Sequence, residues 1–197
     1  MAIGELKIRE RGFTLIELMV VVAIIGIITA VLFVSFEEGR KQSRDKVRMA
    51  ELKELQLAIE LYKSQNGRYP SMGCGNPHPV APTATAPGIW AGPGPFVAVW
   101  GASCGLYITG LVPDFIAQLP QDPNKELDPD TGYLYTTDAS GSAYKLMVEN
   151  SIETDFVNSY SDEFARIPYE CGWTTFGLGQ LPQPHVYAVY SAGAECW

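Results

Sequence analysis

One carboxylate lies inside a long apolar run near the N-terminus. The run "FTLIELMVVVAIIGIITAVLFVSF" covers residues 13–36, and Glu17 is its only charged residue. A charged side chain in hydrocarbon is costly. Glu17 therefore needs access to a membrane interface, a protonated state, or a positive charge from another chain. The last of these would make Glu17 an assembly residue.

Four cysteines form a second set of reactive groups, and all of them follow the apolar run. An even number of cysteines beyond a membrane segment favours disulfides in an oxidising compartment. Sequence order favours two successive pairs, although four cysteines permit three pairings and four buried free thiols are the alternative. Zinc is disfavoured because the chain has only two histidines and no closely spaced ligand pair. The expected pairs are Cys74–Cys104 and Cys171–Cys196.

Two further patterns contain residue types that could form a catalytic site or a metal site. The sequence "GASCG" (101–105) fits the hydrolase pattern G-x-S-x-G around Ser103, but that motif needs a following helix and a larger sheet than this region can supply. We therefore expect no catalytic residue, no bound cofactor and no enzyme activity. Asp122, Asp128 and Asp130 could offer oxygens to calcium. An Asp- and Pro-rich turn is the more common explanation, so we expect no metal site.

The apolar run has the length of a membrane-spanning helix. Its 24 residues would extend about 36 Å as a helix, enough to cross a bilayer. The apolar core of a cleaved secretory signal is shorter. Basic residues precede the run, so we expect a single pass with a cytoplasmic N-terminus and an exported C-terminal part.

Residues 37–65 change to an amphipathic pattern. Leu52, Leu55, Ile59 and Tyr62 recur at helical spacing, so the helix can continue from residue 13 to about residue 65. The sequence "SQNGRYP" (64–70) predicts its end, because Asn-Gly suits a left-handed cap and Pro70 blocks continuation. The alternative is two helices joined by a hinge near Gly39.

Residues 66–197 are expected to form the globular head. They carry four basic and thirteen acidic side chains, which argues against binding of nucleic acid. Residues 71–113 are rich in Gly and Pro and predict an ordered loop region. Residues 133–137 and 143–148 predict a hairpin, and "VYAVY" (186–190) predicts a final strand. Sheet structure is expected from about residue 131.

The N-terminal pattern resembles one known family. "GFTLIEL" (12–18), with basic residues before it and the apolar run after it, is similar to the processing site of type IV prepilins and type II secretion pseudopilins. "LPQDP" and "TGYLY" (119–123 and 131–135) resemble a recurring run in pseudopilins and related minor pilins. A disulfide between Cys171 and Cys196 resembles the C-terminal loop of many type IV pilins.

The resemblance implies a fold and a function. It implies an α+β fold: a long helix, membrane-spanning then amphipathic, packed on a small antiparallel sheet. A prepilin peptidase would remove residues 1–12 by cutting between Gly12 and Phe13, and Phe13 would be methylated. Glu17 would pair with the terminal amine of a neighbouring subunit.

The implied partners are related subunits, the peptidase, the membrane and an inner-membrane assembly platform, with the head periplasmic or extracellular. A pilin and a secretion pseudopilin are the two roles within this class. A monomeric membrane-anchored protein that binds a ligand is the alternative from another class.

Overall fold

The computed structural model describes residues 12–74, 90–93, 101–124, 132–149, 151–154, 162–165 and 185–197, without the side chains of 31, 33–35 and 101–103. The chain divides into two compact units. The N-terminal unit is Met1–Arg40 and the C-terminal unit is Lys41–Trp197.

The helix α1 runs from Leu15 to Asn66. It continues through Gly39, so the alternative of two separate helices is not observed. Its C-terminal end follows the prediction. Gly67 has a φ of 74°, and its N–H donates to the Lys63 carbonyl oxygen at 2.8 Å. Glycine adopts this left-handed conformation without a steric penalty, which is why the helix ends here.

Among the residues that the structure describes, no helix is long and apolar enough to cross a membrane. The assignment of residues 13–36 as a transmembrane segment stays a prediction of the sequence.

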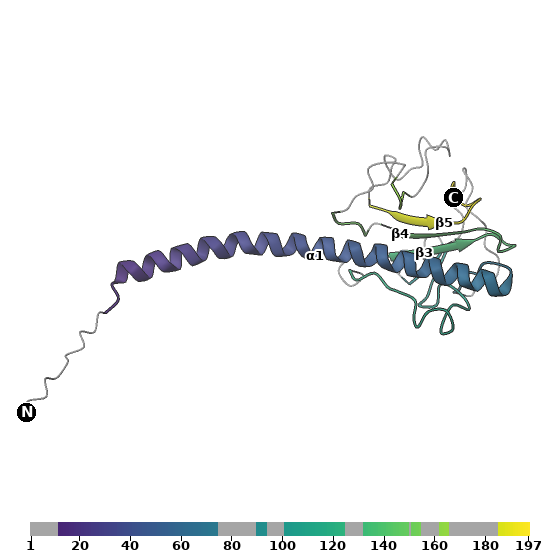
Figure 1. Cartoon of the computed structure of the whole chain (residues 1–197), viewed down its shortest axis with the longest axis horizontal. Coiled ribbons are helices and arrows are strands. Elements are labelled where there is room, and N and C mark those ends of the chain that lie inside the picture. The colour runs from purple at the N-terminus through teal and green to yellow at the C-terminus, as the bar shows by residue number, and fades with distance from the viewer. Residues whose placement is uncertain are drawn as a thin grey trace, which may run out of the picture. The chain divides into compact units, whose positions relative to one another are not determined.

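The C-terminal unit contains a five-stranded sheet in the order β2-β1-β3-β4-β5. Figure 1 labels its strands β3, β4 and β5. The predicted hairpin and final strand are confirmed by three antiparallel strands. The remaining strands are short, and β1 pairs antiparallel with β3 but parallel with β2. The bounds are Trp90–Gly92 for β1, Gly101–Ser103 for β2, Gly132–Thr137 for β3, Tyr144–Glu149 for β4 and Tyr187–Tyr190 for β5.

The α+β class is confirmed, but the sheet differs from the expectation in two respects. It is mixed rather than antiparallel, and two strands come from the loop region 71–113 instead of following residue 131. Three residues are too few to display the alternation by which strands are found in a sequence, which is why β1 and β2 were missed.

The core lies between α1 and one face of the sheet. Leu52, Leu55, Ala58 and Ile59 form the buried face of the helix and belong to one cluster with residues of β3, β4 and β5. A second cluster, formed by Trp90, Leu134, Met147, Val186 and Ala188, lies on the other face of the sheet. Successive strand residues point to opposite faces. Both faces of β3 and β4 are therefore buried.

The disulfide between Cys74 and Cys104 is present, as predicted. It lies next to a short antiparallel contact in which Gly73 donates its N–H to the Tyr107 carbonyl oxygen at 3.0 Å. Cys196 is also disulfide-bonded. Cys171 lies outside the described residues, so the pairing of Cys171 with Cys196 stays a prediction.

Asp138 closes the β3–β4 hairpin. Its carboxylate accepts hydrogen bonds from the backbone N–H groups of Ser140, Ser142 and Ala143 and from both serine hydroxyls. Partial burial alone raises the pKa of Asp138. The hydrogen bonds from Ser140, Ala143 and Ser142 outweigh this effect and lower the pKa to about 2.

We expect Asp138→Ala to lower the free energy of unfolding by about 1 kcal/mol at pH 7, because one acceptor serves several donors in a partly exposed turn. The pKa is lower in the folded than in the unfolded chain. The contribution is therefore complete above the ordinary pKa of 3.8 and is lost as the pH falls through about 2. Urea unfolding of both proteins at pH 7 and pH 2 measures this difference. An equal difference in the free energy of unfolding at both pH values would contradict the role of the Asp138 carboxylate.

Candidate functional site

The residues of the predicted cleavage and assembly site lie at the start of α1. Gly12, Phe13 and Thr14 precede the helix and are not helical, and Leu15 is its first residue. Phe13 is 86% exposed in this single chain. The Gly12–Phe13 peptide bond is thus outside the helix and open to solvent. The structure places it there, while its cleavage stays a prediction.

Glu17 has a partner within its own chain. Its Oε2 accepts a hydrogen bond from the Thr14 N–H at 2.9 Å and one from the Thr14 hydroxyl at 2.8 Å. The Glu17 N–H in turn lies 3.3 Å from the Thr14 hydroxyl oxygen, to which it donates. This reciprocal pattern is a capping box, in which a threonine and a glutamate three residues later satisfy the free amides at a helix start.

The capping box adds an interaction that the three alternatives proposed for Glu17 from the sequence did not include. Thr14 of the same chain already binds its carboxylate. The signal was present in the sequence as T-x-x-E before an apolar run, within the same residues that resemble a processing site. A second chain would therefore have to compete with the cap, or share the other carboxylate oxygen, to bind Glu17.

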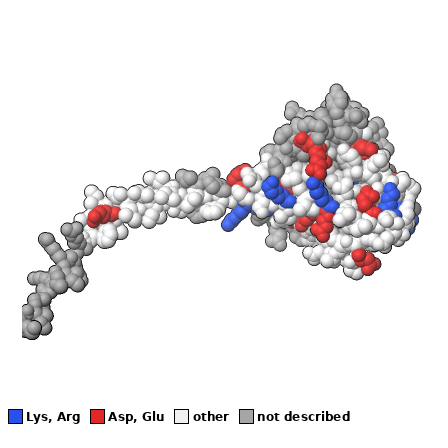
Figure 2. Space-filling view, in the orientation of Figure 1, with Lys and Arg blue, Asp and Glu red and all other residues white. Residues whose placement is uncertain are grey.

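The helix of the N-terminal unit presents apolar side chains to solvent all round. Figure 2 shows the first part of this helix white apart from one acidic patch near its start, and charged side chains return at its end, where the sequence has Glu37, Glu38 and Arg40. Exposed apolar surface on this scale marks a site of contact with membrane or protein. Its large side chains with at least half of their surface exposed are Leu15, Ile16, Leu18, Met19, Val20, Val22, Ile24, Ile25, Ile27, Ile28 and Phe36.

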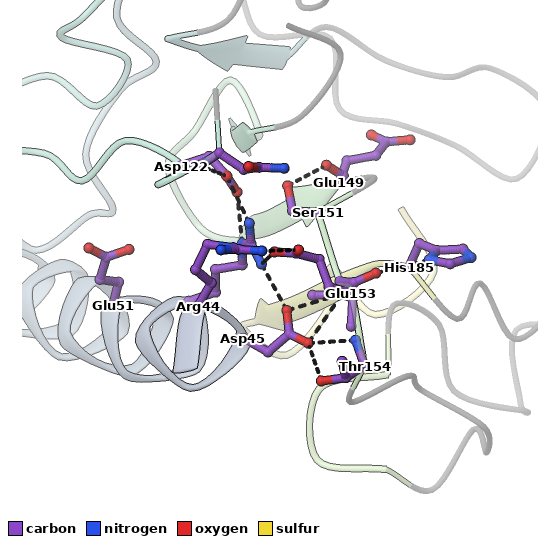
Figure 3. A network of polar contacts seen from close by, with 12 residues as sticks. Arg44, Asp45, Glu51, Asp122, Glu149, Ser151, Glu153, Thr154 and His185 are labelled. Carbon is purple, nitrogen blue, oxygen red and sulfur yellow. Dashed lines mark hydrogen bonds and ion pairs between the residues drawn. The ribbon is translucent and has the colours of Figure 1, made fainter. Parts of the chain in front are cut away.

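In the C-terminal unit, a buried network of charges ties α1 to two loops (Figure 3). At its centre is Arg48, whose side chain is completely buried. Arg48 donates from Nε and Nη2 to the two oxygens of Asp122, both at 2.9 Å. Its Nη1 donates to Asp45 at 2.8 Å and to Glu153 at 3.0 Å. Burial alone would lower the pKa of Arg48, but its three acidic partners raise it.

Asp45 and Arg44 complete the network on the side of residues 151–154. Asp45 accepts hydrogen bonds from the N–H groups of Glu153 and Thr154 and from the Thr154 hydroxyl. Arg44, whose side chain is partly exposed, forms a bidentate ion pair with Glu153. The hydrogen bond from Arg44 is the main cause of the lowered pKa of Glu153. The network therefore fixes both loops to the first turns of α1 in this unit.

Asp122 is thus an ion-pair partner of Arg48. Both of its oxygens accept from Arg48, and Oδ1 also accepts from the Asn124 N–H at 2.7 Å. Asp128 and Asp130 lie outside the described residues. Within the described ranges, no group of three or more His, Cys, Asp or Glu side chains is placed to hold a metal ion.

The "GASCG" segment is part of the sheet and of a disulfide, and it does not have the surroundings of a hydrolase nucleophile. Gly101–Ser103 form β2, and Cys104 is in the disulfide. Turns follow it through residue 124, with no helix in this described stretch. The strand–turn–helix geometry of the nucleophile motif is therefore not formed.

Comparisons with known proteins concern mainly the N-terminal region. Residues 7–33 match the model of the prokaryotic N-terminal methylation motif. The chain is 39% identical over 69 residues to the type II secretion system core protein G of Pectobacterium carotovorum subsp. carotovorum, covering 34% of this chain and 44% of that protein. It is 44% identical over 72 residues to the type IV major pilin protein PilA of Myxococcus xanthus, covering 35% and 31%.

The matches support the resemblance to the pilin and pseudopilin family but cover no complete relative. A further match, to core protein G of Escherichia coli, has 40% identity over 68 residues and covers 34% of this chain and 46% of that protein. The chain spans less than half the length of each of these curated relatives. No solved structure matches the chain.

Proposed function

We propose, on the premise that the N-terminal third of this chain belongs to the type IV pilin and type II secretion pseudopilin family, that the protein is a structural subunit of a type IV pilus-like filament. The observation that carries the proposal is the apolar helix of the N-terminal unit, exposed on every side and starting at a methylation motif. Such a surface is stable in water only when lipid or other chains cover it.

The proposed pathway starts in the inner membrane, where residues 13–36 anchor the precursor with residues 1–12 in the cytoplasm. A prepilin peptidase cuts between Gly12 and Phe13, which creates a positively charged amine on Phe13. An assembly platform then adds the subunit to a bundle in which apolar helices cover one another. The amine of one chain meets Glu17 of a neighbour, where low polarity strengthens their attraction.

The role of the C-terminal unit in this proposal is to form the outer part of the filament. The Cys74–Cys104 disulfide supports exposure to an oxidising compartment. The network around Arg48 attaches the loops of this unit to α1.

A secretion pseudopilin is the second candidate. It is favoured by identity to core protein G and by the run "LPQDP" (119–123). In this run Leu119 and Asp122 are buried, and Asp122 pairs with Arg48. The run thus also has a packing role in the C-terminal unit.

Filaments sheared from cells and analysed by electron microscopy and mass spectrometry test the proposal. We expect fibres that contain this chain starting at a methylated Phe13. A secretion defect on deletion, with no fibres in the wild type, would favour the pseudopilin. A chain that keeps residues 1–12 and stays monomeric in the membrane would contradict both and favour an anchored ligand-binding protein.

A further inference from the structure

The helix α1 has a second apolar stripe in the C-terminal unit, on the side that faces away from the core. Val47, Leu57 and Leu61 are 43%, 62% and 46% exposed, and Ala50 is exposed between them. With Glu54, these residues are spaced by three, four, three and four. This spacing places them along one line of a helix. The solvent side of a helix that packs on a sheet is normally polar, so this stripe requires an explanation.

Charged side chains of both signs lie on or beside this outer stripe. The two exposed lysines, Lys46 and Lys53, precede the two exposed glutamates, Glu54 and Glu60. Lys53 forms an exposed ion pair with Glu163, and Glu60 accepts a hydrogen bond from the Tyr69 hydroxyl. In the part of the chain that the structure describes, Lys46 and Glu54 form no hydrogen bond or ion pair with another side chain.

A regular displacement relates the lysines to the glutamates. Glu54 lies eight residues after Lys46, and Glu60 lies seven residues after Lys53. Seven to eight residues correspond to about 10–12 Å along a helix. Two parallel copies of α1 that are shifted by this amount therefore bring both lysines of one copy level with both glutamates of the other. The same shift brings Ala50 level with Leu57, a small residue against a large one.

Other arrangements of two copies fit less well. Without a shift, each lysine faces the same lysine of the other copy, which is repulsive. An antiparallel pair matches Lys46 with Glu60 and Lys53 with Glu54. In the proposed filament, however, the apolar helices of all copies enter one bundle from the same direction. An antiparallel contact is therefore incompatible with that assembly.

We propose that the outer stripe of α1 docks against the outer stripe of a second copy of this chain, parallel and displaced by seven to eight residues, with Lys46 of one copy paired to Glu54 of the next. This inference rests on the proposed function and adds the register of the contact. The contact is heterologous, because each copy uses its lysines toward one neighbour and its glutamates toward the other. Such contacts propagate into filaments.

Charge exchange at Lys46 and Glu54 tests the register. Lys46→Glu creates a Glu–Glu contact between copies, and Glu54→Lys creates a Lys–Lys contact. We expect each variant alone to lower the yield of sheared filaments roughly two- to fivefold in cells that carry the assembly machinery. Cells that produce both variants, and cells that produce the doubly exchanged chain, should regain the wild-type yield, because opposite charges then meet again.

The matched control is Arg68→Glu, which changes the net charge as Lys46→Glu does but lies beyond the helix at an exposed position. It should leave the yield unchanged, and the melting temperature of the C-terminal unit should be the same in all variants. Wild-type filaments together with no recovery in the doubly exchanged chain would overturn the register. An antiparallel contact predicts that failure, because the glutamate introduced by Lys46→Glu would face Glu60 of the other copy. If the wild type forms no filaments, the proposed function itself fails.

Discussion

Replacement of Glu17 by glutamine is expected to abolish filament assembly while cleavage after Gly12 continues. Glutamine can accept the hydrogen bonds of the Thr14 capping box, so the start of α1 should be preserved. It carries no charge and cannot form an ion pair with the amine of Phe13 on a neighbouring chain. Glu17→Ala removes the cap and the charge together, and it should also be cleaved but not assembled.

Thr14→Val is the matched control, because it removes the capping hydroxyl and keeps the carboxylate. We expect this variant to assemble, since Glu17 then lacks its hydrogen bond from the Thr14 side chain but retains its charge. Cleavage is measured by the mobility of the chain on a denaturing gel, and assembly by imaging of sheared filaments. Normal fibres from Glu17→Gln, together with none from Thr14→Val, would assign Glu17 to the helix cap and remove the intersubunit pair.

Replacement of Arg48 by methionine is expected to produce the largest loss of stability in the C-terminal unit. Methionine fills a similar volume but removes the ion pairs that Arg48 forms with the buried carboxylates of Asp45 and Asp122. Removal of one partner from a buried ion pair costs about 3–5 kcal/mol, because the remaining charge stays buried and uncompensated. Glu153 retains Arg44, so the loss should be concentrated at Asp45 and Asp122.

Urea unfolding of the full chain in detergent, followed by tryptophan fluorescence, measures this loss. Lys53→Met is the control, because it removes an ion pair with Glu163 whose side chains are 55% and 69% exposed. It should change the free energy of unfolding by less than about 1 kcal/mol. Similar values for the two variants would show that the network around Arg48 contributes no more than a surface pair.

Local patterns in the sequence were sufficient to predict several parts of the structure. The end of α1 follows from Asn66 and Gly67, which cap the helix. The hairpin follows from the turn residues 138–142 between two short strand-forming runs, and β5 from the alternation near the C-terminus. Each of these elements is specified by neighbours in the sequence, and such signals can be interpreted without knowledge of the fold.

The features that were missed depend on distant residues. β1 and β2 are strands because β3 lies beside them, and their own three residues contain no pattern. Asp45 and Arg48 continue the buried line of Leu52 and Leu55 at helical spacing, yet charged residues on a helix usually face water. Their burial becomes understandable only once the loops at Asp122 and Glu153 are known to supply the opposite groups.

The network around Arg48 also determines when, during synthesis of the chain, this part of α1 can be buried. Its hydrogen bonds from α1 to the two loops join residues separated by 74 to 109 positions. A chain that emerges from its N-terminus therefore exposes Asp45 and Arg48 to water until the segment ending at Thr154 arrives. Before that point, burial of this face would leave charges uncompensated, so a shortened chain keeps the first turns of its helix hydrated. Docking of this part of α1 thus requires that the chain up to Thr154 has already been made.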